Sequence, residues 1–255
     1  MNQNSTMTIG LTELFELQDE VLKRNLLRND VLPKTGALSS LVSVCYHALE
    51  EMKFSPEKQE VVRRFACDTL SHVVTAARVG LWGALPESLS VLRGAVESCA
   101  QLAYVVAQNQ YKTVIHEANR GNFQEFSFRQ ACKKSGLRGE RLMNLHNRFS
   151  SSFSHSTSKR FKQLGYEFEG ETYDRIGSAA DPVVSRVCTH FCLVIAAELV
   201  RCLMEAYIQD ERNFPWGEEV AQLLEFVASL PGEAASAVGV EEDVREANGD
   251  GTDRN

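Results

Sequence analysis

The sequence predicts an all-α fold, a single-domain bundle of about seven or eight helices over residues 12–231. Hydrophobic residues make up 44% of the 255 residues, which is enough to build one sizeable core. Long segments repeat their apolar residues every three or four positions, which is the period of a helix face. The chain has only six prolines and few β-branched runs, so both interruptions and strands are scarce.

The first part of the chain is expected to form three helices. The first covers residues 12–28, and the second covers residues 37–52 after a break at Pro33. The third starts in the sequence FSPEKQE, where a serine N-cap, a proline and acidic residues form a typical first turn. It is expected to run from Pro56 to about Val79.

Residues 84–108 predict the central helix of the bundle. Its apolar residues recur at alternating steps of three and four, and further apolar residues extend around most of its circumference. A helix that is apolar nearly all round is usually buried at the centre of a protein. Arg93 and Glu97 are four residues apart on it, so we expect them to form a structural ion pair on one face.

Three shorter helices are expected next, over residues 111–119, 123–134 and 137–153. The sequence KQLGYEFEGETYDRIGSAADP that follows alternates aromatic and polar residues between glycines. This pattern predicts a loop that can form a short hairpin.

Two helices are expected to complete the bundle. The first runs from residue 181 to about Tyr207. Its most apolar stretch, VCTHFCLVIAAELV, is flanked by Arg186 and Arg201 and contains His190 and Glu198, so we interpret it as too short and too polar for a membrane span, and therefore as a core helix. The second is amphipathic and covers residues 217–230. Residues 1–11 lack an apolar signal core and are expected to be flexible. Residues 232–255 carry seven acidic and two basic residues, which predicts a disordered acidic tail.

The seven cysteines are an odd number, and no Cys-x-x-Cys pair occurs. Most lie among apolar neighbours, as expected for reduced, buried thiols of a cytoplasmic protein. Cys188, His190 and Cys192 could suggest a metal site, but on a helix the histidine points away from the two cysteines. We therefore expect neither a metal nor another cofactor.

One segment is strongly basic. Residues 129–162 contain nine lysines and arginines and one acid, a net charge of +8. Such a segment is either a solvated face or a surface that attracts the RNA backbone. Under the second interpretation, the candidate RNA-binding residues are Arg141, Lys159, Arg160 and Lys162.

The sequence NRFSSSFSHS lies within this basic segment and predicts a polar stripe. Arg148 and His155 are seven residues apart, so they return to nearly the same face of a helix. Serine is a weak helix former, and the serine run could let the helix end or bend near His155. A neighbouring apolar stripe is expected to be buried, and it consists of Leu142, Leu145, Phe149 and Phe153.

Two short motifs resemble those of known helical proteins. Arg148 is followed by six residues and His155, and in the HEPN superfamily of helical-bundle proteins an Arg is followed by four to six residues and a His. The chain is also similar to an uncharacterised group of bacterial helical proteins with Arg-x-x-x-Glu and Ser-x-x-x-His motifs. Arg93 and Glu97 match the first of these, and Ser151 and His155 match the second.

For active members of the HEPN superfamily, the resemblance implies metal-independent RNA cleavage at a dimer interface. It implies His155 as general acid/base and Arg148 as the residue that stabilises charge on the phosphate. Ser151 and Asn147 would be supporting polar groups. Active members often carry Asn, Asp or His directly after the arginine, whereas this sequence has Phe149 there.

The biological context is likewise implied only by the resemblance, which covers about residues 88–207. It suggests a toxin or abortive-infection effector of a bacterial or phage conflict system. It also implies a homodimer and a neutralising protein partner, with no membrane.

A structural, non-catalytic role for these residues stays open as an alternative. Arg148 and His155 could form a structural polar network, in which the imidazole bonds serine hydroxyls and the guanidinium pairs with Glu97 or another acid. The protein would then be a non-catalytic helical module that binds a protein partner or a nucleotide. Gly-rich phosphate loops, His-Glu-x-x-His motifs and paired cysteine motifs do not occur in the sequence.

Overall fold

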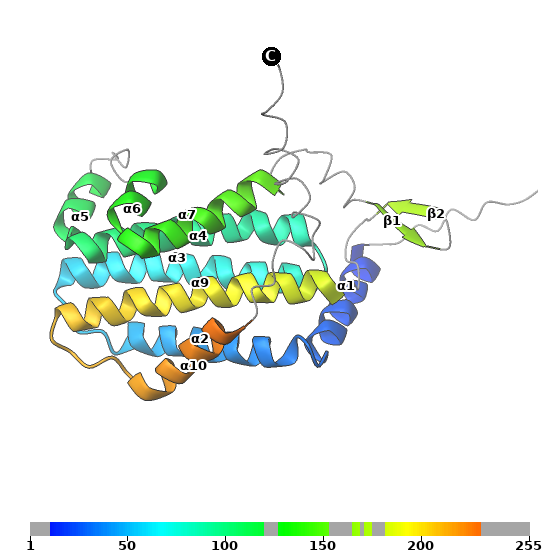
Figure 1. The fold of residues 1–255 in the computed structure, drawn as a ribbon, viewed down its shortest axis with the longest axis horizontal. Helices are drawn as coiled ribbons and strands as arrows, with labels where there is room; N and C mark the ends of the chain where they lie inside the picture. The colour runs from blue at the N-terminus through cyan, green and yellow to red at the C-terminus, as the bar shows by residue number, and fades with distance from the viewer. Residues whose placement is uncertain (1–10, 120–126, 153–164, 169–170, 175–181, 231–255) are drawn as a thin grey trace, which may run out of the picture.

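A computed structural model describes residues 11–119, 127–152, 165–168, 171–174 and 182–230 (Figure 1). The predicted all-α fold is confirmed. The helices are α1 (Leu11–Leu26), α2 (Leu32–Glu50), α3 (Pro56–Leu81), α4 (Leu85–Gln108), α5 (Tyr111–Asn119), α6 (Phe128–Lys134), α7 (Gly136–Ser152), α9 (Pro182–Gln209) and α10 (Gly217–Ser229). The expected hairpin is formed by β1 (Gly165–Phe168) and β2 (Glu171–Asp174), which pair antiparallel.

The expected number of helices was too low. Within the described ranges there are nine rather than seven or eight, and they correspond to the nine helical segments expected one by one along the sequence. Asn109 adopts a left-handed conformation, with φ of 52°, and separates α4 from α5. Gly136, the first residue of α7, has a φ of 59° and likewise separates α7 from α6. A residue in this conformation cannot continue a right-handed helix.

The expected start of the second helix was also wrong. Helix α2 begins at Leu32, five residues before the predicted start. Pro33 lies in its first turn, where the missing N–H has no intrahelical partner to lose. The proline therefore starts this helix, whereas we had expected it to break the chain.

The bundle is built on the long helices α2, α3, α4 and α9, which run along the longest axis of the molecule (Figure 1). Helix α4 packs against α3, α7 and α9, and α10 lies against α2 and α9. The predicted central helix is confirmed, because the apolar residues of α4 are buried along most of its length. Its position brings α4 into contact with every element that carries a candidate residue described below.

Helix α9 is the second core element. By length and composition alone, its segment Ser185–Gln209 could cross a membrane, because it has 25 residues and its most apolar window of 18 residues has a mean hydropathy of 1.8. However, 78% of its most apolar window is buried inside the protein. This is the environment of a core helix in a soluble protein, as predicted.

Two glycines let α3 approach its neighbours closely. A Cβ added at Gly80 would lie 2.3 Å from Cβ of Cys188 on α9. A Cβ added at Gly94 of α4 would lie 2.8 Å from the His72 ring of α3. These contacts set how α3 packs on α9 and α4.

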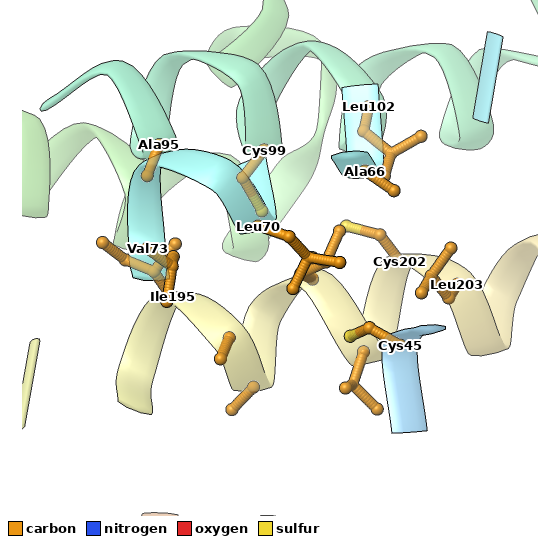
Figure 2. Packing of buried hydrophobic residues seen from close by; sticks show 14 of the residues in the cluster. Cys45, Ala66, Leu70, Val73, Ala95, Cys99, Leu102, Ile195, Cys202 and Leu203 are labelled. Atoms are coloured by element: carbon orange, nitrogen blue, oxygen red, sulfur yellow. The ribbon is translucent and has the colours of Figure 1, made fainter. Parts of the chain in front are cut away.

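The cysteines are free, and all but one are buried. Figure 2 shows Cys45, Cys99 and Cys202, from α2, α4 and α9, near Leu70 of α3. Burial raises the pKa of the Cys188 thiol to about 12. Cys67 is exposed, so the prediction of buried thiols does not hold for this residue.

Candidate functional site

Helix α7 carries the first part of the predicted polar stripe. Its apolar side packs into the bundle as predicted, because Leu142, Leu145 and Phe149 are buried. The Phe149 ring meets the Phe191 ring of α9 edge-on, with centroids 5.1 Å apart. Phe153, the fourth residue of the expected stripe, lies outside the described residues. Burial of this side fixes which residues of α7 face solvent.

The predicted catalytic residues are only partly placed. Asn147 and Arg148 are adjacent and exposed on α7. Ser151 belongs to the last turn of α7. His155 lies outside the described residues, so its pairing with Arg148 stays a prediction.

A cluster of polar side chains joins α7 to α4. The ion pair expected between Arg93 and Glu97 is formed, with Nε 3.0 Å from Oε1. The same Oε1 lies 2.9 Å from Nε2 of His146 on α7. A carboxylate only accepts hydrogen bonds, so Nε2 of His146 carries the proton. The His146 ring stacks on Phe128 of α6, with centroids 4.2 Å apart.

The direction of α7 brings the backbone of Ser151 to the level of Arg93 in the bundle. Gln108 donates to the backbone carbonyl of Lys134, just before α7, whereas the later residue His146 meets the earlier residue Glu97. Helices α4 and α7 therefore run antiparallel. Ser151 lies about 7.5 Å further along α7 than His146, and Arg93 lies about 6 Å back along α4 from Glu97. The backbone at Ser151 is therefore near the level of Arg93.

His146 is the residue of this cluster that the sequence interpretation missed. Two signals could have identified it. It is four residues after Leu142 and three before Phe149, so it lies beside the buried stripe. It also follows Arg141 by four intervening residues, which is within the spacing of the Arg and His in the HEPN resemblance.

Part of the basic segment is compensated by acids on α9. Arg141 forms an ion pair with Glu198 at 3.0 Å, although its side chain remains 59% exposed. Arg138 forms an ion pair with Glu205 at 2.6 Å. The exposed basic residues of this segment without an acidic partner among the described residues are Arg129, Lys133, Lys134 and Arg148. Lys159, Arg160 and Lys162 lie outside the described residues.

Glu198 is a buried carboxylate that joins several helices. Its Oε1 accepts hydrogen bonds from Arg141 and from Arg201, at 3.0 and 2.9 Å. Its Oε2 is 3.7 Å from Nε of Arg138, which is an ion-pair distance but too long for a hydrogen bond. Burial would lower the pKa of Arg138, but Cys202, Glu205 and Glu198 outweigh burial and raise it. This network fixes α7 on α9.

The chemistry available in the described ranges is that of cations, carboxylates and one imidazole. No group of three or more His, Cys, Asp or Glu side chains that could hold a metal ion occurs there. An arginine, a carboxylate and an imidazole in contact can bind an anion and orient one another. No protein-family model, curated protein or solved structure matches the chain.

Proposed function

We propose that the protein is a HEPN-like, RNA-directed protein with metal-independent endoribonuclease activity. The observation that supports this best is the arrangement of α7. Its apolar side is buried, mainly against α4, and it exposes Asn147 and Arg148 in the two positions after His146, which binds Glu97 of the Arg93–Glu97 pair. Arg93 and the backbone of Ser151, the described residue of the Ser-x-x-x-His motif, thus lie at similar levels of the α4–α7 pair.

The proposed chemistry is cleavage through the ribose 2′-hydroxyl. The imidazole of His155 takes the proton of this hydroxyl, and the 2′-oxygen then forms a bond to the adjacent phosphorus. The bond from phosphorus to the 5′-oxygen breaks, and the leaving oxygen takes a proton from a protonated imidazole of a second copy. The guanidinium of Arg148 stabilises the negative charge on the phosphate. Asn147 and Ser151 are supporting groups, and the products are a 2′,3′-cyclic phosphate and a 5′-hydroxyl.

The charge distribution supports an RNA ligand. Arg148 and the basic side chains of α6 are exposed and belong to the segment with a net charge of +8. Arg141 is bound to Glu198 but still more than half exposed, so its remaining donors can reach a phosphate. A cytoplasmic location, a homodimer, a neutralising partner and a role as toxin or abortive-infection effector belong to the same proposal.

A second candidate is the non-catalytic helical module. The observation that favours it is the number of charged contacts that brace α7. Glu198 holds Arg141, and Glu97 holds His146, as a structural polar network would. In this case the module binds a protein partner or a nucleotide.

Cleavage of a mixed RNA pool in excess EDTA tests the proposal. Wild-type protein is compared with His155→Ala, Arg148→Ala and the control Arg64→Ala, an exposed arginine of α3. We expect cleavage by wild type and by the control only, with unchanged melting temperatures for all four proteins. Cleavage that survives both site substitutions would contradict the assignment of His155 and Arg148. Absence of cleavage by any of them would favour the helical module.

A further inference from the structure

Arg93 is held at one end of its guanidinium group. Its Nε donates to Glu97 at 3.0 Å, and its side chain is 41% exposed. A guanidinium has five N–H donors, of which four are on the two Nη atoms. Among the described residues, neither Nη atom donates a hydrogen bond to Glu97, which binds Nε instead. The edge formed by the two Nη atoms is the one that binds two oxygens of a phosphate in parallel.

Glu97 is itself held in place from a second helix. His146 donates to the same carboxylate oxygen that Arg93 uses, and the His146 ring is covered by Phe128. The His146 side chain is only 14% exposed, so packing restricts its rotamer. A carboxylate that is fixed by two donors fixes the arginine in turn, which lowers the entropy that the arginine loses when it binds a ligand.

An arginine–glutamate ion pair elsewhere in the chain shows what is particular to the Arg93, Glu97 and His146 cluster. Arg64 and Glu60 of α3 are also four residues apart and form an ion pair of 2.6 Å, with the arginine side chain 72% exposed. Among the described residues, no third side chain fixes this pair. It has the charges of Arg93 and Glu97 without the support from a second helix.

We propose that Arg93 is a phosphate-binding residue of the site, with Glu97 and His146 as its positioning residues, and that its ligand is a phosphodiester of the RNA backbone. The choice of RNA rests on the proposed function. The backbone at Ser151 lies near the level of Arg93, and Arg148 is exposed on the same helix. Both arginines therefore reach the surface near one level of the α4–α7 pair.

Equilibrium binding of a fluorescent, fully 2′-O-methylated RNA decamer in EDTA tests the inference, because this probe cannot be cleaved through the 2′-hydroxyl. We expect Arg93→Gln to weaken binding about tenfold and to lower the salt slope by about one. Arg64→Gln is the matched control and should leave both unchanged. His146→Phe keeps the stacked ring but loses the donor, and we expect it to weaken binding about threefold.

Coupling between the variants separates positioning from general stability. If His146 acts through Arg93, the double variant should bind no more weakly than Arg93→Gln alone. Effects that multiply would overturn the positioning role of His146. An effect of Arg93→Gln no larger than that of Arg64→Gln would overturn the binding role of Arg93, even if wild type cleaves RNA.

A second probe distinguishes failure of the inference from failure of the proposed function. Inorganic phosphate is titrated into ¹⁵N-labelled protein, and the NMR signal of the Arg93 Nε–H group is followed. This signal is identified as the one that is lost in the Arg93→Gln variant. A shift of this signal without any binding of the RNA decamer would keep the phosphate site and refute the RNA-directed function. An unmoved signal together with unchanged RNA binding by Arg93→Gln would refute the phosphate site alone.

Discussion

Nε2 of His146 lies 2.9 Å from Oε1 of Glu97, and this contact joins α7 to α4 across 49 residues of sequence. Glu97 also binds Arg93 of its own helix, so one carboxylate oxygen connects the two helices that carry the predicted motifs. The Glu97 side chain in this contact is still 38% exposed, and this exposure limits how much the contact contributes to the stability of the fold. Exposed ion pairs contribute little, because water screens them.

Glu97→Gln should therefore change stability only slightly. The carboxylate is 38% exposed, so we expect a loss of about 1 kcal/mol or less in the free energy of unfolding. Urea unfolding measures this loss, with Glu60→Gln as the control for an exposed helical pair. A loss several times larger would show that the cluster is mainly structural and would favour the helical-module alternative.

Glu198→Gln should be far more damaging. The Glu198 side chain is 3% exposed and has arginines on both carboxylate oxygens, so its neutralisation leaves their charges without a common partner. Removing one partner from a buried ionic network costs about 3 kcal/mol. The measurement is again urea unfolding, and Glu218→Gln on exposed α10 surface should lie within about 0.5 kcal/mol of wild type. Equal stability of the two variants would contradict the role of Glu198.

Lys58→Met tests a buried cation at the end of α9. Nζ of Lys58 donates to the carbonyl of Ala206 and to Asp210, each at 2.6 Å. Methionine keeps the volume but leaves the carbonyl and the carboxylate without their donor, which should cost about 3 kcal/mol. The exposed Lys53→Met is the control, and thermal unfolding at neutral pH compares the two.

The helical glycines predict three different outcomes for substitution by alanine. At Gly80 the new Cβ meets a buried Cβ of Cys188 that cannot move aside, so we expect a loss of about 2 kcal/mol. At Gly94 the obstacle is the end of the His72 side chain, which can rotate, and the change should lie within about 1 kcal/mol. At Gly36 nothing lies within 4 Å, so alanine should stabilise α2 by up to about 1 kcal/mol. A neutral Gly80→Ala would show that α3 and α9 pack less closely than in the structure.

Alkaline pH should destabilise the fold through its buried thiols. Burial raises the pKa of Cys188 to about 12, from 9.0, so the folded protein keeps a proton that the unfolded chain loses. Below pH 9 both states hold this proton, and stability does not depend on it. From pH 9 upward, stability falls with a slope of about 1.4 kcal/mol per pH unit for such a thiol, until pH 12.

The variant Cys188→Ala should reduce this slope, and the exposed Cys67→Ala should leave it unchanged. The urea midpoint measured at intervals from neutral pH to about pH 10.5 gives the slope for each protein. Identical slopes for wild type and Cys188→Ala would refute the contribution of this thiol.

Much of the fold was predictable because its signals are local. The start of α3 at Pro56 follows from a serine and a proline in adjacent positions, and the burial of α4 follows from its apolar residues on all sides. The buried face of α7 was also predictable, because Leu142, Leu145 and Phe149 recur at helical spacing. Misjudged elements were those whose interpretation depends on one ambiguous residue, such as Pro33 in the first turn of α2.

The sequence by itself determined the helices, their buried faces and the Arg93–Glu97 pair, because these depend on residues three or four positions apart. The tertiary structure decided that Glu97 meets His146 and that Glu198 pairs with Arg138 and Arg141. Their partners are 49 to 60 residues away, and only the direction and register of packed helices bring them together. A helical period specifies which side of a helix is apolar, but it does not specify which helix covers that side.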